Sequence, residues 1–122
     1  MPKLLVVDDE IDILEVSKSY FKKRGVEVFT AATGKEALDI ITKENPDLIL
    51  LDFNLPDING AEILRKMREE MKLNTKVLMV TGLEEDMVIR ETEKYGTLGC
   101  IHKPLILENL EKVVLVELNA GS

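Results

Sequence analysis

The sequence predicts an α/β protein: a doubly wound (βα)5 fold, in which a five-stranded parallel sheet carries helices on both faces. Short apolar runs alternate five times with segments of helical periodicity along the 122 residues, as in consecutive βαβ units. Residues 4–7 form a continuous run of β-branched and other apolar residues, which is typical of a strand covered on both faces. Hydrophobic residues make up 45% of the chain, enough to fill the core of one domain of this length.

The five expected strands are short and rich in branched apolar residues. They span residues 4–7, 26–30, 48–51, 77–80 and 98–101. Residues 48–51 form the most apolar of these runs. We therefore place this strand at the centre of the sheet, where both of its faces are buried.

A segment with helical spacing of apolar residues follows each strand. The five expected helices comprise residues 10–24, residues 33–44, the segment marked by Ile63, Leu64, Met67 and Met71, residues 84–95, and residues 107–118. Gly25 ends the first helix behind three basic residues, which suit the negative carboxyl end of a helix dipole. Thr33 and Glu36 have the spacing of a capping box at the start of the second helix.

The net charge and the length of the apolar runs disfavour several classes of protein. The chain has 16 basic and 23 acidic residues, a net charge of −7, which disfavours direct binding to nucleic acid or to an anionic membrane. Its longest apolar runs hold about four residues, far fewer than the ~18 of a membrane span. The single cysteine, Cys100, permits no disulfide within the chain and is typical of a reducing compartment. We expect a cytoplasmic protein with one domain at residues 1–118 and a tail or the start of a linker at residues 119–122.

Ionisable and hydroxyl side chains follow four of the expected strands. Asp8 and Asp9 follow the first strand, Asp52 the third, Thr81 the fourth and Lys103 the fifth. Taken singly, each has a structural explanation: a helix cap for Asp8 or Asp9, a turn residue for Asp52 or Thr81, and a solvated lysine for Lys103. Because ligands bind outside the carboxyl ends of the strands in such sheets, their convergence favours a functional site.

The residue types at this edge indicate phosphoryl transfer. Three converging carboxylates repel one another unless a cation neutralises them, and oxygen ligands suit Mg²⁺. Zinc is disfavoured, because Cys100 and His102 are the single cysteine and the single histidine of the chain. A carboxylate beside Mg²⁺, a hydroxyl and a lysine can attack phosphorus while the cations neutralise the phosphoryl oxygens.

Four motifs make the chain resemble the receiver domain of two-component response regulators over essentially its whole length. They are VVDDE at residues 6–10, LLDFNLP at residues 50–56 with Gly60, VTG at residues 80–82, and KP at residues 103–104. The resemblance implies the flavodoxin-like strand order 2-1-3-4-5. It also implies a protein that catalyses only its own phosphorylation and dephosphorylation, either as a stand-alone regulator or as part of a longer one.

The resemblance implies a role for each acidic site residue. Asp52 is then the phosphoacceptor, which receives a phosphoryl group from the phosphohistidine of a sensor histidine kinase or a histidine phosphotransfer protein. Asp9 binds Mg²⁺ directly, Asp8 holds it through water, and Asn54 contributes its backbone carbonyl.

The remaining motif residues receive roles in the same way, with one departure. Lys103 contacts the phosphoryl group, Pro104 follows a cis peptide bond, and Thr81 is the switch hydroxyl. Receivers commonly carry tyrosine or phenylalanine three residues before the lysine, where this chain has Cys100. We therefore expect the signal to rely on the loop of residues 81–86 and on the helix that follows, rather than on an aromatic ring.

Three other functions stay open at this point. A phosphatase of the haloacid-dehalogenase type also uses an aspartyl nucleophile, but its general acid is an aspartate where this chain has Asn54. A nucleotide- or flavin-binding domain needs a glycine- or threonine-rich first turn, whereas residues 8–10 are all acidic. A receiver that binds partners without being phosphorylated is the third alternative.

Two surfaces are candidates for partners. In receivers the kinase's helical bundle docks against the first helix and the loop after the fifth strand, which here indicates Ile13, Val16 and the segment 104–105. Residues 113–116 are apolar around a whole helical turn, so some of them face outward and suggest a homodimer through the last helix.

Overall fold

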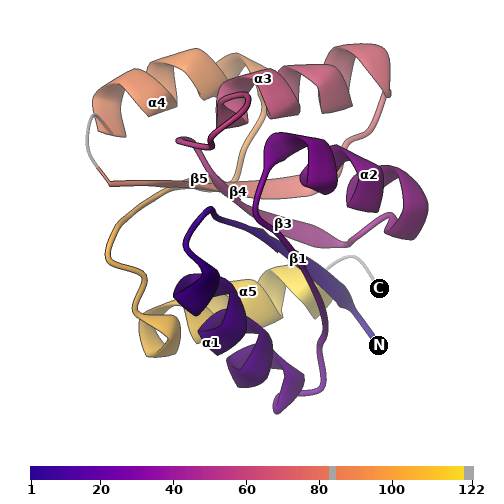
Figure 1. The fold of residues 1–122 in the computed structure, drawn as a ribbon, viewed down its shortest axis with the longest axis vertical. Coiled ribbons are helices and arrows are strands. Elements are labelled where there is room, and N and C mark those ends of the chain that lie inside the picture. The colour runs from indigo at the N-terminus through magenta and orange to yellow at the C-terminus, as the bar shows by residue number, and fades with distance from the viewer. Residues whose placement is uncertain (83–84, 120–122) are drawn as a thin grey trace.

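The structure, a computed structural model, describes residues 1–82 and 85–119. Five parallel strands form one sheet in the order β2-β1-β3-β4-β5; β1, β3, β4 and β5 are labelled in Figure 1. The strands are β1 (Lys3–Val7), β2 (Glu27–Ala31), β3 (Leu48–Asp52), β4 (Lys76–Thr81) and β5 (Gly99–His102). The predicted fold class and strand order are thus confirmed.

Helices cover both faces of the sheet. They are α1 (Ile11–Lys22), α2 (Gly34–Glu44), α3 (Gly60–Arg65) with the π-helical turn η1 (Lys66–Glu70), α4 (Glu85–Thr92) with the 3₁₀ turn η2 (Glu93–Tyr95), and α5 (Leu107–Asn119). In Figure 1, α1 and α5 lie on one face, and α2, α3 and α4 lie on the other. Among the described residues, none of the helices combines the length and the apolar character needed to cross a bilayer.

The predicted boundaries differ from the observed ones by a few residues. The first helix ends at Lys22 rather than at residue 24, because the chain turns at Gly25 (φ +82°) and the amide of Val26 donates to the carbonyl of Phe21. The second strand is shifted by one residue, since β1 pairs with it from Lys3↔Glu27 onward. Residues 84 and 120–122, parts of the predicted fourth helix and of the predicted tail, lie outside the described residues.

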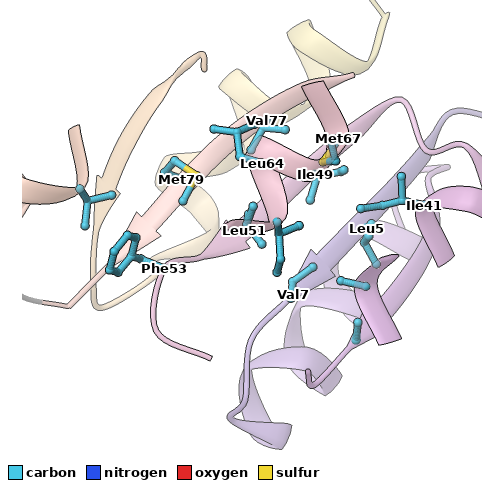
Figure 2. Packing of buried hydrophobic residues seen from close by; sticks show 14 residues of the cluster. Leu5, Val7, Ile41, Ile49, Leu51, Phe53, Leu64, Met67, Val77 and Met79 are labelled. Atoms are coloured by element: carbon cyan, nitrogen blue, oxygen red, sulfur yellow. The ribbon is translucent and has the colours of Figure 1, made fainter. Parts of the chain in front are cut away.

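The central strand β3 explains why its sequence is continuously apolar. It pairs with β1 on one side and β4 on the other, and all five of its residues are buried. Ile49 and Leu51 face the core under α2, α3 and α4, which Figure 2 shows. Leu48 and Leu50 face the core under α1 and α5. Asp52 is therefore the last residue of a strand that is enclosed on every side.

Gly60 brings the start of α3 against the end of β3. Its amide donates to the carbonyl of Phe53 at 2.7 Å. A Cβ at Gly60 would lie 2.8 Å from the backbone oxygen of Asp52 and 3.0 Å from the Cα of Phe53. Only glycine fits without a shift of the backbone that carries Asp52.

Gly60→Ala is expected to destabilise the fold by about 1–3 kcal/mol, because the new methyl group meets backbone atoms that cannot move aside. Glycine to alanine in a helix usually has the opposite effect, a gain of roughly 0.5–1 kcal/mol. Urea unfolding measures the difference. Gly82→Ala is the control, because a Cβ there meets only the Cδ of Lys103, at 4.0 Å. Equal stability of the two variants would contradict the close approach.

Candidate functional site

The carboxyl edge of the sheet brings the predicted acidic residues together. Asp8 and Asp9 follow β1, and Asp52 ends β3. One carboxylate oxygen from each of the three lies within 4.8 Å of the other two. Asp8 and Asp52 are buried, whereas Asp9 is exposed. The cluster is thus open to solvent on the side of Asp9.

Lys103 enters the cluster from the loop after β5. Its Nζ lies 2.9 Å from Oδ2 of Asp52 and 3.2 Å from Oδ2 of Asp8. Its backbone amide donates to the carbonyl of Thr81, the last residue of β4, at 2.7 Å. The peptide bond between Lys103 and Pro104 is cis. Lys103 therefore links the ends of three strands.

Each buried carboxylate divides its oxygens between the backbone and the lysine. Oδ1 of Asp8 accepts a hydrogen bond from the amide of Glu10 at 2.8 Å, and Oδ1 of Asp52 accepts one from the amide of Asn54 at 3.2 Å. In both residues it is Oδ2 that faces Lys103. The two following turns thus orient the carboxylates toward the same cation.

Burial governs the charge balance of the site. It raises the pKa of Asp52, and the charge of Asp8 adds to the rise, although Lys103 partly offsets it. Burial alone lowers the pKa of Lys103, but its hydrogen bond and charge interactions with Asp52 and Asp8 outweigh this effect and raise the pKa. The cluster contains three carboxylates, two of which contact the ammonium group of Lys103, so the site favours a further cation.

The hydroxyl and thiol positions lie in the neighbouring strands β4 and β5. Thr81 is fully buried at the end of β4. Cys100 is half-buried and packs against the core under α2, α3 and α4. Burial, together with the charge of Glu85, raises the pKa of Cys100 to about 11. The thiol is therefore neutral at physiological pH, and it is much smaller than an aromatic ring.

Asp57 is a structural residue that the motif analysis did not single out. Its two carboxylate oxygens accept hydrogen bonds from the amides of Gly34 and Lys35, at 2.8 and 2.9 Å, and these bonds lower its pKa. A Cβ at Gly34 would lie 2.5 Å from Cγ1 of Ile58. Asp57 thus fastens the loop after Asp52 to the start of α2. The acid is visible in the sequence, but its partners come from a different βα unit.

Comparison with known proteins decides the family. A sequence model described as the response regulator receiver domain matches residues 4–115. The chain belongs to the response regulator receiver domain family. It is thus a receiver domain of the two-component systems, as the motifs predict.

Individual receivers resemble the chain over most of its length. Sporulation initiation phosphotransferase F of Bacillus subtilis is 38% identical over 112 residues, which cover 92% of this chain and 90% of that protein. A CheY-like receiver of Methanospirillum hungatei has a TM-score of 0.90 and 32% identity, and the match covers 98% of this chain and 95% of that one. TrrA of Thermotoga maritima, in complex with Mg(2+)-BeF, has a TM-score of 0.81 and 30% identity, with 97% and 100% covered.

Asp52→Asn is expected to raise the melting temperature at neutral pH without divalent metal. The raised pKa means that folding disfavours the ionised carboxylate, so stability is lost as pH rises from the ordinary carboxyl pKa through the raised value. The difference between variant and wild type should therefore shrink in acid, as calorimetry across that range can measure.

Asp57→Asn is the matched control with the opposite sign. In the wild type, the pKa of Asp57 is lowered. The carboxylate therefore stabilises the fold above the ordinary carboxyl pKa, and this stability is lost as pH falls through the lowered value. At neutral pH, the Asp57→Asn control should have a lower melting temperature than the wild type. A lower melting temperature for Asp52→Asn as well would contradict the charge balance described for the site.

Proposed function

We propose that Asp52 accepts a phosphoryl group from the phosphohistidine of a sensor histidine kinase or of a histidine phosphotransfer protein. The observation that carries this proposal is the placement of Asp52: a buried carboxylate at a strand end, 2.9 Å from the lysine ammonium and grouped with two further acids. The protein acts only on itself, and we place its activity in the cytoplasm.

The transfer exchanges one bond at phosphorus for another. A carboxylate oxygen of Asp52 forms a bond to phosphorus while the bond between phosphorus and the donor imidazole breaks, and the electron pair leaves with that imidazole nitrogen. The ammonium of Lys103 neutralises charge on the phosphoryl oxygens. The hydroxyl of Thr81 donates a hydrogen bond to one of them.

The acidic cluster fits a magnesium ion. Its donors are all oxygens, they converge within 4.8 Å, and they carry more negative charge than Lys103 balances. Asp9 would bind the ion directly, Asp8 through water, and Asn54 through its backbone carbonyl, with Asp52 as a further ligand. When bound, Mg²⁺ supplies charge neutralisation for the phosphoryl oxygens.

Mg²⁺ at millimolar concentration is expected to raise the melting temperature, because it binds the folded state and relieves the repulsion among the carboxylates. Calorimetry of wild type and of Asp9→Asn measures the effect, which the variant should largely lose. Asp12→Asn, which changes an exposed acid on α1, should keep it. An identical shift in all three proteins would contradict a metal site at this cluster.

Asp52→Asn is expected to abolish phosphorylation. Wild type incubated with Mg²⁺ and acetyl phosphate should gain the mass of one phosphoryl group, measured on the intact protein, and Asp57→Asn should gain it too. A phosphoryl group on the Asp52→Asn variant at a comparable rate would overturn the assignment. No gain on wild type would favour the alternative of a receiver that is not phosphorylated.

Cys100 changes how the signal leaves the site. A phosphoryl group on Asp52 draws the hydroxyl of Thr81 toward it and so pulls on the segment between β4 and α4. The cysteine lacks a ring that would follow this movement. We infer that β4 and α4 carry the response; residues 83 and 84 of that segment lie outside the described part of the chain.

The expected partner surfaces present apolar side chains. Val16 on α1 is 58% exposed, Ile13 is half-buried, and Pro104 is exposed, which suits docking of a kinase or phosphotransfer helix. On α5, Val113 and Val116 are exposed. These two residues lie three positions apart, on the same side of the helix.

We propose that the valine side of α5 forms a homodimer. Light scattering should give twice the monomer mass with Mg²⁺ and beryllofluoride, a phosphoryl mimic, and Val116→Glu should restore the monomer because it would bury a charge. Lys112→Glu, an exposed position on the same helix, is the control for added charge. A monomer for wild type both with and without beryllofluoride would end this proposal.

A further inference from the structure

Arg68 forms a cluster of backbone contacts that the phosphoryl-transfer site does not use. The residue lies in η1, and its guanidinium donates four hydrogen bonds. Nε donates to the carbonyl of Tyr95 at 2.7 Å and Nη2 to that of Gly96 at 3.0 Å. Nη1 donates to the carbonyl of Leu73 at 2.8 Å, and Nη2 also to that of Thr75 at 2.9 Å. One side chain thus joins η1 to residues 73–75, which precede β4, and to the end of residues 85–96, which comprise α4, η2 and Gly96 and are called the α4 segment below.

The chemistry of these contacts is that of a helix terminus. Tyr95 ends η2, and Gly96 follows it in the left-handed conformation. A cation at this end satisfies carbonyls that have no partner within the helix and faces the negative end of its dipole. Desolvation lowers the pKa of Arg68. None of the ion pairs found among the described residues involves Arg68, so backbone carbonyls compensate its charge.

The other end of α4 is held differently. There, Glu85 pairs with His102 of β5 at 3.4 Å, and both side chains are substantially exposed, by 41% and 54%. Exposed contacts of this kind stabilise little, and this one is an ion pair only when His102 is protonated. Among the described residues, Glu85 at the start of α4 thus makes a solvated side-chain contact, whereas the far end receives two charge-assisted bonds from a half-buried guanidinium.

We propose that Arg68 is a positioning residue that fixes the C-terminal end of the α4 segment to η1, so that a signal from Asp52 moves mainly the end of α4 near Thr81. The proposal rests on the proposed function for the origin of the signal. Gly60 places α3 against the backbone of Asp52, and α3 continues into η1. Arg68 thus holds the far end of α4 to the segment that leaves the phosphoacceptor.

The first measurement needs no ligand. Amide hydrogen exchange by NMR on the full chain should show Gly96 and Leu98 exchanging about tenfold faster in Arg68→Met than in wild type, relative to Ile49 in β3, because the local tie is lost. Arg65→Met is the matched control, since Arg65 pairs with Glu62, Glu69 and Glu70 of its own helical segment. It should leave the ratio unchanged. Equal ratios in Arg68→Met and wild type would overturn the proposal.

The second measurement adds Mg²⁺ and beryllofluoride. In wild type the amide shift changes within the α4 segment should be concentrated at residues 85–89, and in Arg68→Met they should extend through residues 93–96. Shift changes that already reach residues 93–96 in wild type would refute the fixed end. Absence of any change at Lys103 in both proteins would count against the proposed function instead, and the exchange measurement then decides the role of Arg68.

Arg68→Lys guards against a variant that does not fold. Lysine keeps the charge but lacks the planar fork that reaches all four carbonyls. Its exchange ratio for Gly96 and Leu98 should lie between those of wild type and Arg68→Met. A ratio equal to that of wild type would show that charge alone is sufficient and would contradict the role of the four directed bonds.

Discussion

The contact between Lys103 and the two buried carboxylates, Asp52 and Asp8, is the interaction on which the rest of the structure depends. It joins the ends of β1 and β3 to the loop after β5, and a hydrogen bond from the backbone of Lys103 adds the end of β4. Packing of the apolar strands buries these charged ends. Lys103 offsets part of the unfavourable free energy of removing the carboxylates from water. Gly60 and Asp57 hold the loop around the acids in place.

The contact with Lys103 leaves part of the negative charge of the three carboxylates unbalanced. The proposed function depends on this excess negative charge. Burial disfavours the ionised form of Asp52 despite the nearby ammonium, so ionisation of Asp52 destabilises the fold. In the proposed function, a divalent cation would relieve the repulsion among the carboxylates, and a phosphoryl group would bring new oxygens to Lys103 and Thr81. The free energy of these events would act on β4, which ends at this edge of the sheet, and on α4, which follows it along the chain.

The fold could be predicted because its signals are local. The apolar run at residues 48–51 predicts a central strand, and the motif residues follow strand ends that any doubly wound sheet brings together. The π-helical turn η1, the four contacts of Arg68 and the bonds from Gly34 and Lys35 to Asp57 could not be predicted. Each depends on which residues of distant βα units become neighbours, and neither composition nor periodicity contains that information.

Burial, more than the lysine, governs the ionisation of Asp52. The most direct test is a titration of the Asp52 side-chain carboxyl carbon by NMR, in protein labelled with ¹³C. We expect a pKa above that of an ordinary aspartate, which falls when Mg²⁺ is added. A pKa at or below the ordinary value in the metal-free protein would contradict this account, because Lys103 alone would then compensate for burial.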